Sequence, residues 1–225
     1  MTAMSFLRRL SGLAAASFLR RGITRFTFRL PGKRPSKRIW FALSATVLLV
    51  PLSIGGWVLA LRATGNVHAI EPSVLYRSAQ LSAFELDALV TELGIRTVIN
   101  LRGANPQAQW YVEEIDEASR RGVSHIDIRM SAREAPTTST LRQLADAMRS
   151  APKPILIHCK DGADRTGLAA ALYELIIAHR SVVVAEHQLS FRYGHFPWLG
   201  SQTVAMDKTF DDIVAHVDEL SPSEP

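Results

Sequence analysis

Cysteine is the scarcest reactive residue in this chain, since Cys159 is the only one among 225 residues. A single cysteine excludes an internal disulfide framework and a zinc site built from several cysteines. Acidic residues are absent from the first 62 positions, which hold eleven of the 26 lysines and arginines. The remainder therefore has 15 basic and 21 acidic residues, a net charge of −6. Such an acidic body cannot neutralise a phosphate backbone over a broad face, which excludes a general nucleic-acid-binding function.

A long uncharged run, residues 39–61, follows the basic N-terminal segment. At about 1.5 Å per residue, a helix of this length covers the hydrocarbon core of a bilayer, about 30 Å thick. Trp40 and Trp57 lie near its ends, where aromatic rings favour the membrane interface. We expect a single uncleaved transmembrane helix instead of a cleavable signal peptide ending near Leu61, because the preceding basic region is much longer than a signal n-region. A buried core helix is a third interpretation.

The charge asymmetry around this run predicts the topology. Ten basic residues precede it and only Arg62 follows closely, so the N-terminus stays in the cytoplasm and the C-terminal body crosses the membrane. In a bacterium that body is periplasmic, and a mitochondrial inner-membrane location is the alternative, because the N-terminal composition also fits a presequence. The basic segment is either an interfacial helix or a disordered tail. The predicted organisation is a basic segment (1–38), a transmembrane helix (39–61), a linker (62–72), a folded domain (73–220) and a frayed tail (221–225).

Strand and helix patterns alternate in the folded domain. Short apolar runs rich in β-branched residues predict four strands, and amphipathic stretches between them predict helices. Ser82 with Glu85 forms a capping box that starts a helix ending before Gly94. This alternation predicts an α/β fold with a mostly parallel central sheet flanked by helices. The predicted strands are 74–77, 96–101, 123–129 and 154–158, and the predicted helices are 83–93, 108–121, 137–150, 166–179, 182–192 and 205–220.

The stretch ILIHCKDGADRTGLAAALYELI, residues 155–176, carries the chemistry. A buried-type strand ends at His158, a short loop with Gly162 follows, and an apolar helix starts near Arg165. Backbone amides at a helix N-terminus form an anion cradle, and together with the arginine they favour the thiolate of Cys159. Arg165 offers a planar fork to two oxygens of a phosphate, and Thr166 can donate a hydrogen bond to the sulfur.

The segment HCKDGADRTG resembles the signature of cysteine-dependent protein tyrosine and dual-specificity phosphatases. LYRSAQLS (75–82), TVINLRG (97–103) and FRYGHFPWL (191–199) are similar to small bacterial, membrane-tethered members, so the resemblance covers roughly residues 70–200. It implies a protein tyrosine phosphatase-like fold, a Cys159 that attacks phosphorus, an Arg165 that binds the phosphoryl group and a carboxylic acid that protonates the leaving oxygen. The implied phosphate-binding residues are Lys160, Asp161, Gly162, Ala163, Asp164, Arg165 and Thr166.

The general acid is open between two residues. The family places an acid in the loop before the long helix, and Glu134 is the only carboxyl in that loop here (residues 130–138), where most relatives have aspartate. Asp164, inside the cradle, resembles the in-loop aspartate that serves as acid in another bacterial branch. Asp127 is a rival by sequence distance, but strand alternation favours a structural role.

Several other residues have a structural and a functional interpretation. We expect His158 to orient the loop, Arg77 and Arg102 to tie loops together through carboxylates, and the aromatic residues Tyr193, Phe196 and Trp198 to pack. The alternatives are substrate contacts for the two arginines and a rim for an aryl phosphate for the aromatic residues. The seven histidines lack metal-ligand spacing and no cofactor motif is present, so neither a metal nor a cofactor is expected.

The sequence thus predicts phosphomonoester hydrolysis through a phosphocysteine, with a shallow site that accepts phosphotyrosine and at least one other phosphomonoester. A phospholipid head-group phosphatase, acting on a phosphoinositide or phosphatidylglycerophosphate, is the main alternative because of Lys160 and the tether. A catalytically weak module that binds a phosphorylated ligand is the second alternative.

Overall fold

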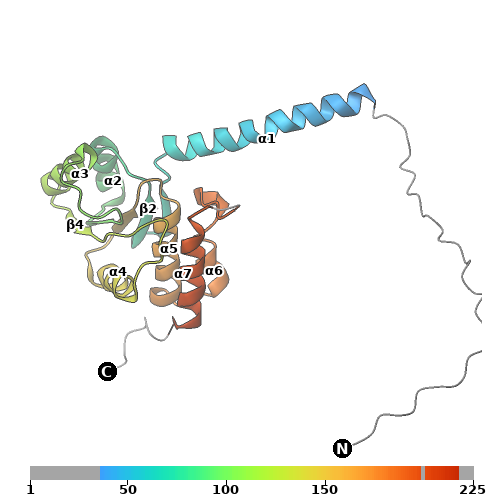
Figure 1. Cartoon of the computed structure of the whole chain (residues 1–225). Coiled ribbons are helices and arrows are strands. Elements are labelled where there is room, and N and C mark those ends of the chain that lie inside the picture. The colour runs from blue at the N-terminus through green and yellow to red at the C-terminus, as the bar shows by residue number, and fades with distance from the viewer. Residues whose placement is uncertain (1–35, 199–200, 218–225) are drawn as a thin grey trace, which may run out of the picture. The chain divides into compact units, whose positions relative to one another are not determined.

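The computed structural model describes residues 36–198 and 201–217 (Figure 1). Most of the basic segment 1–38, the tail 221–225 and residues 218–220 of the helix predicted for 205–220 lie outside these residues. Within them that helix ends at Ala215, earlier than predicted. Helix α1, Lys37–Ala63, contains the whole predicted span 39–61 and has Pro51 inside it. Its window Thr46–Ala63 has a mean hydropathy of 1.7 and none of it is buried. Among the described residues, this one helix is long and apolar enough to cross a membrane, by length and composition alone.

A five-stranded sheet forms the centre of the domain. Its strands are β1 (His68–Glu71), β2 (Leu75–Ser78), β3 (Thr97–Asn100), β4 (Ser124–Asp127) and β5 (Ile155–His158), in the order β1-β2-β5-β3-β4. β1 pairs antiparallel with β2, and all other neighbours are parallel. The predicted α/β fold with a mostly parallel sheet is confirmed, and four strands lie within two residues of their predicted bounds.

The linker predicted for residues 62–72 needs correction, because it contains β1 and the last turn of α1. The segment HAIE has one buried apolar side chain, Ile70, and no alternating run. Its extended form therefore comes from pairing with the edge of β2, a non-local contact that local pattern does not indicate.

Two layers of helices cover the sheet (Figure 1). α2 (Ala83–Leu93) and α3 (Gln109–Arg120) pack with Val98 and Leu156 on one face. α4 (Thr138–Ser150), α5 (Asp164–Leu172), the π-helical turn η1 (Tyr173–Ile177), α6 (Val182–Glu186) and α7 (Val204–Ala215) pack with Ile155 and Ile157 on the other. The alternation of side chains along β5 thus divides the core into two layers. The predicted capping box at Ser82 and the left-handed C-cap at Gly94 are confirmed.

The helix predicted for 182–192 is wrong in length. α6 ends at Glu186, and a 3₁₀ turn, η2 (Phe191–Tyr193), follows after an irregular segment. The first turn of α6 is a run of three exposed valines, and valine is a weak helix former. In addition, the backbone oxygen of Gln188 accepts a hydrogen bond from Arg77 at 2.9 Å, which competes with continued helix formation.

Candidate active site

Three neighbouring parallel strands end together at one edge of the sheet. Ser78 of β2 and Asn100 of β3 are both in register with His158 of β5. Residues 159–163, called the cradle loop below, follow β5 at this edge and lead into α5. Its first residue, Cys159, is the only cysteine and is 3% exposed. The carboxyl edge of a parallel sheet is where open α/β folds bind ligands.

The backbone oxygens of His158, Lys160 and Asp161 are held by donors from outside the cradle loop. Leu101 N binds His158 O at 2.9 Å, and Gln80 N binds Lys160 O at 3.1 Å. Asn66 Nδ2 donates to Asp161 O at 3.0 Å. In the part of the chain that the structure describes, no backbone amide of residues 160–163 has a hydrogen-bond acceptor. Four unpaired donors on a loop that leads into a helix N-terminus form a site for an anion.

Arg77 supports the cradle loop from below the surface. Its side chain is fully buried, and Nη2 donates to Gly162 O at 2.8 Å while Nη1 donates to Gln188 Oε1 at 2.8 Å. The guanidinium also stacks on the ring of Tyr193, 3.8 Å from the centroid. Burial lowers the pKa of Arg77 to about 10. The predicted loop-tying role is confirmed, except that its acceptors are a backbone oxygen and an amide instead of carboxylates.

Glycine at position 162 is required by conformation and by space. Gly162 has φ of +70°, and a Cβ there would lie 2.7 Å from the backbone nitrogen of Ala79. At the start of α5, a Cβ on Gly167 would lie 2.8 Å from the backbone oxygen of Gln188. The loop therefore rests directly on the end of β2, and α5 lies directly against the segment after α6.

Arg165 lies in the first turn of α5, beside the ends of β3 and β4. Nη1 donates to Met130 O at 3.3 Å and to Leu101 O at 3.5 Å. Its Nε and the hydroxyl of Thr166 are buried and have no hydrogen-bond partner among the described residues. Lys160 and Asp161 are exposed, whereas Gly162 and Ala163 are buried. The structure therefore gathers the predicted residues 159–166 in a single strand–loop–helix segment.

The carboxylates proposed as general acids have different surroundings. Asp164 Oδ1 lies 2.7 Å from Nδ1 of the buried His195, whose Nε2 lies 3.0 Å from Oδ2 of Asp207. Burial lowers the pKa of His195, but contacts with the two aspartates outweigh it and raise the pKa overall. Glu134 is exposed in the loop before α4 and has no hydrogen bond to any described residue. The rival Asp127 accepts hydrogen bonds from Asn100 and Tyr111, which places it in a structural network.

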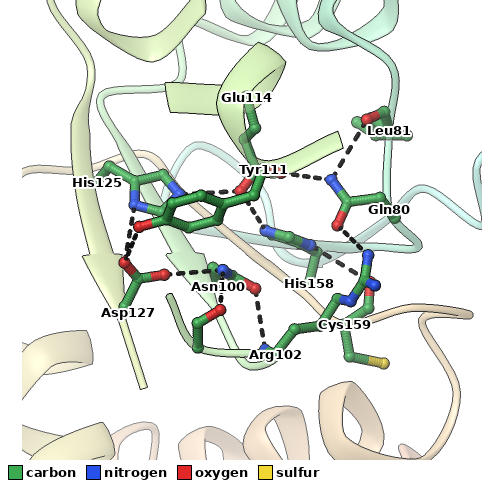
Figure 2. A network of polar contacts seen from close by, with 11 residues as sticks. Gln80, Leu81, Asn100, Arg102, Tyr111, Glu114, His125, Asp127, His158 and Cys159 are labelled. Carbon is green, nitrogen blue, oxygen red and sulfur yellow. Dashed lines mark hydrogen bonds and ion pairs between the residues drawn. The ribbon is translucent and has the colours of Figure 1, made fainter. Parts of the chain in front are cut away.

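A second network, absent from the sequence predictions, lies behind Cys159 (Figure 2). Glu114 of α3 contacts His125 Nε2 at 2.9 Å and His158 Nε2 at 3.2 Å, and it accepts from Gln80 Nε2 at 2.6 Å. Burial raises the pKa of Glu114, but these contacts outweigh it and lower the pKa to about 2. His158 Nδ1 lies 3.3 Å from the backbone oxygen of Cys159. His158 thus joins this network to the cradle loop, in agreement with its predicted orienting role.

Side chains that pair across the fold could not be identified from sequence spacing. Glu114 stands in an amphipathic helix beside Glu113, which is exposed, so no local signal marks it as buried. The one available signal for His195 was its place in the stretch 191–199. Within residues 36–198 and 201–217, no cluster of His, Cys, Asp or Glu has the geometry to hold a metal ion.

Comparison with known proteins agrees with this geometry. The dual specificity protein phosphatase TpbA of Pseudomonas aeruginosa strain UCBPP-PA14 is 36% identical over 124 residues, 54% of this chain and 51% of that protein. TpbA of strain PAO1 is 35% identical over the same shares. The chain thus spans about half the length of the curated relatives it matches. A crystal structure of P. aeruginosa TpbA has 25% identity and a TM-score of 0.50, covering 68% of this chain and 91% of that one.

A more distant structure shows the fold alone. The crystal structure of PTPMT1 matches with a TM-score of 0.52 and 18% identity, over 68% of this chain and 99% of that one.

The family model described as "DSP-PTPase phosphatase fused to NAD+ Kinase" matches residues 60–205, which include the cradle loop, Arg165 and the Glu114 network. The resemblance stated from the sequence is therefore confirmed: this chain belongs to the DSP-PTPase phosphatase family.

Proposed function

We propose that this phosphatase hydrolyses phosphomonoesters through a phosphocysteine formed on Cys159. The observation that carries the proposal is the run of four backbone amides, 160–163, that have no acceptor among the described residues and directly follow the buried thiol. In the first step the thiolate sulfur forms a bond to phosphorus, and the bond from phosphorus to the leaving oxygen breaks. In the second step water attacks phosphorus, the sulfur–phosphorus bond breaks, and inorganic phosphate and the thiolate are released.

Arg165 and Thr166 support both steps in this proposal. Arg165 binds two oxygens of the phosphoryl group with its guanidinium fork, and its buried Nε, which has no partner among the described residues, is a donor available to the phosphate. The Thr166 hydroxyl, also buried and unpaired within the described residues, donates to the sulfur when Cys159 leaves phosphorus. The remaining predicted phosphate-binding residues contribute their backbone amides.

We assign the general acid to Glu134 instead of Asp164. A general acid must donate a proton to the leaving oxygen, which requires a carboxyl that can reach the substrate. Asp164 Oδ1 is already bonded to His195, whereas the Glu134 carboxyl is exposed. Glu134 stands four residues after Met130, whose backbone oxygen contacts Arg165, so its loop begins at the site. Asp164 then positions the start of α5.

The substrates are phosphorylated proteins in this proposal, with phosphotyrosine and phosphoserine or phosphothreonine both accepted. The curated relatives are named dual specificity protein phosphatases, which supports this class. The test is hydrolysis of phosphotyrosine peptides, phosphoserine or phosphothreonine peptides, phosphoinositide head groups and phosphatidylglycerophosphate by the full chain in detergent micelles. A hundredfold preference for lipid head groups, or for tyrosine alone, would contradict the permissive protein-directed site.

The mechanism is tested with three variants and an aryl phosphate. Cys159→Ser should abolish turnover and retain phosphate binding, and Arg165→Lys should reduce kcat strongly because a point charge does not replace the fork. Glu134→Gln should remove the pH dependence that comes from the general acid, while Asp164→Asn should keep it. Substantial turnover by Cys159→Ser, or loss of wild-type activity on chelation, would refute the phosphocysteine mechanism.

We further propose that α1 is an uncleaved single-pass anchor with the N-terminus in the cytoplasm. The phosphatase domain then lies on the other side, in the periplasm of a bacterium. A reporter fused after residue 62 should behave as exported, and the mature chain should stay in the membrane fraction at high salt. Release of a soluble fragment that begins near Leu61 would show that the apolar segment is a cleaved signal peptide.

A further inference from the structure

Arg102 is a cation at the active-site edge whose role the mechanism above leaves open. It follows β3, and the preceding residue, Leu101, donates its amide to His158 O at 2.9 Å. The backbone oxygen of Leu101 also contacts Arg165 Nη1 at 3.5 Å. Arg102 therefore follows a residue whose backbone contacts His158, which precedes the cradle loop, and Arg165, which follows it.

Two neighbours hold the Arg102 side chain in place. Gln80 Oε1 accepts from Nη1 at 2.9 Å, and the guanidinium lies over the ring of Trp110 at 3.4 Å from its centroid. Gln80 is itself fixed by the 2.6 Å hydrogen bond to Glu114 (Figure 2). A guanidinium supported on one edge and one face is pre-organised, so little side-chain entropy is lost when it binds a ligand.

The two guanidiniums at this edge have no carboxylate partner. In the described part of the chain, neither Arg102 nor Arg165 lies within 4.0 Å of an acidic oxygen. Arg102 makes a single side-chain hydrogen bond there, to Gln80, and its other donors remain available. Burial and then the positive charge of Arg165 lower the pKa of Arg102. Like charges held together in this way favour an anionic ligand.

We propose that Arg102 forms a second anion subsite, which binds a phosphate or carboxylate next to the phosphoryl group that is transferred. Among the phosphorylated proteins proposed as substrates, the enzyme then favours those with a further phosphate or carboxylate close to the reacting phosphorus. This inference rests on the proposed function for the first anion site, formed by the cradle loop and Arg165. The Glu114–Gln80 pair acts through Arg102 and is a positioning element.

Two non-hydrolysable probes differ only in the second anionic group: methylphosphonate and methylenediphosphonate. Their inhibition constants are measured against aryl phosphate hydrolysis by the full chain in detergent micelles. We expect Arg102→Gln to weaken methylenediphosphonate at least tenfold and methylphosphonate less than threefold. Gln80→Leu should give a smaller loss in the same direction. Arg121→Gln is the matched control, because Arg121 lies at the C-cap of α3 and pairs with Asp87.

Calorimetric binding of both probes to the Cys159→Ser chain repeats the comparison without turnover. It separates failure of this inference from failure of the phosphocysteine mechanism. Equal weakening of both probes by Arg102→Gln would overturn the subsite, because Arg102 would then serve the transferred phosphate or the fold. Unchanged affinity for the diphosphonate would overturn it as well. An equal loss of affinity for methylenediphosphonate in Arg121→Gln would show that the effect comes from the net charge of the chain, and it would also refute the inference.

Discussion

The tight packing of the cradle loop on β2 predicts a large effect of one methyl group at position 162. Gly162→Ala places a Cβ 2.7 Å from Ala79 N and 2.8 Å from Ser78 O, which are backbone atoms and cannot rotate away. The left-handed backbone costs about 1–2 kcal/mol for a residue with a Cβ. Overpacking adds about 1–3 kcal/mol. The substitution should therefore lower the free energy of unfolding by about 2–5 kcal/mol, or kcat should fall because the loop moves away.

Gly94→Ala is the matched control for this prediction. Gly94 has φ of +67°, close to that of Gly162, but a Cβ there has nothing within 4 Å. Its substitution should show the backbone cost alone, about 1–2 kcal/mol, with kcat unchanged. For a domain of this size, 1 kcal/mol corresponds to a Tm change of about 2–4 °C. Thermal unfolding followed by circular dichroism and aryl phosphate hydrolysis compare the two variants. Equal Tm losses with full activity in both would refute the close approach of loop and strand.

Three further predictions concern the groups around the cradle loop. Asn66→Ala removes the donor to the backbone oxygens of Asp161 and Tyr193. Calorimetry should then show a lower Tm, and aryl phosphate hydrolysis should show a lower kcat. An unchanged kcat would exclude a role of Asn66 in positioning the cradle loop. The pKa of His195 in the folded chain is raised above 6.5, so its stabilisation is complete below pH 6.5 and is lost as the pH rises through the folded pKa. The Tm difference between wild type and His195→Gln should therefore shrink between pH 6 and pH 9. A growing difference would contradict the direction of the pKa shift. The pKa of Glu114 in the folded chain, about 2, lies below 4.5, so its stabilisation is present above pH 4.5 and is lost as the pH falls towards 2. Denaturant titrations should show that the difference in free energy of unfolding between wild type and Glu114→Gln disappears over that range. A constant difference would contradict the role of the network.

Local chemistry explains why much of the fold could be predicted. The cradle loop, its strand and its helix occupy one continuous segment, so the residues 159–166 meet through chain connectivity alone. Capping at Ser82 and the β-branched strands are also decided within a few residues. These features depend on backbone conformation, which short-range sequence patterns report well.

Pairings between distant elements account for what the sequence did not predict. Glu114, His125 and His158 come from α3, β4 and β5, and their contact depends on the register of the sheet and the face that α3 turns to it. A buried glutamate contradicts the usual pattern of an amphipathic helix, where charge marks the solvent face. Likewise, β1 forms because β2 offers an unpaired edge, and its own four residues carry little strand signal.

The position of Asn66 limits how far the cradle loop lies from the end of α1. Only two residues, Thr64 and Gly65, lie between Ala63, where α1 ends, and Asn66, whose side chain donates to Asp161 O at 3.0 Å. The three Cα–Cα steps from Ala63 to Asn66 span at most about 10 Å. With α1 anchored in a bilayer as proposed, this short connection keeps Asn66, and with it the contact to the cradle loop, close to the end of the helix. The enzyme then meets its substrates by lateral diffusion in a thin layer next to the bilayer, and phosphoesters in bulk solution must diffuse to that layer.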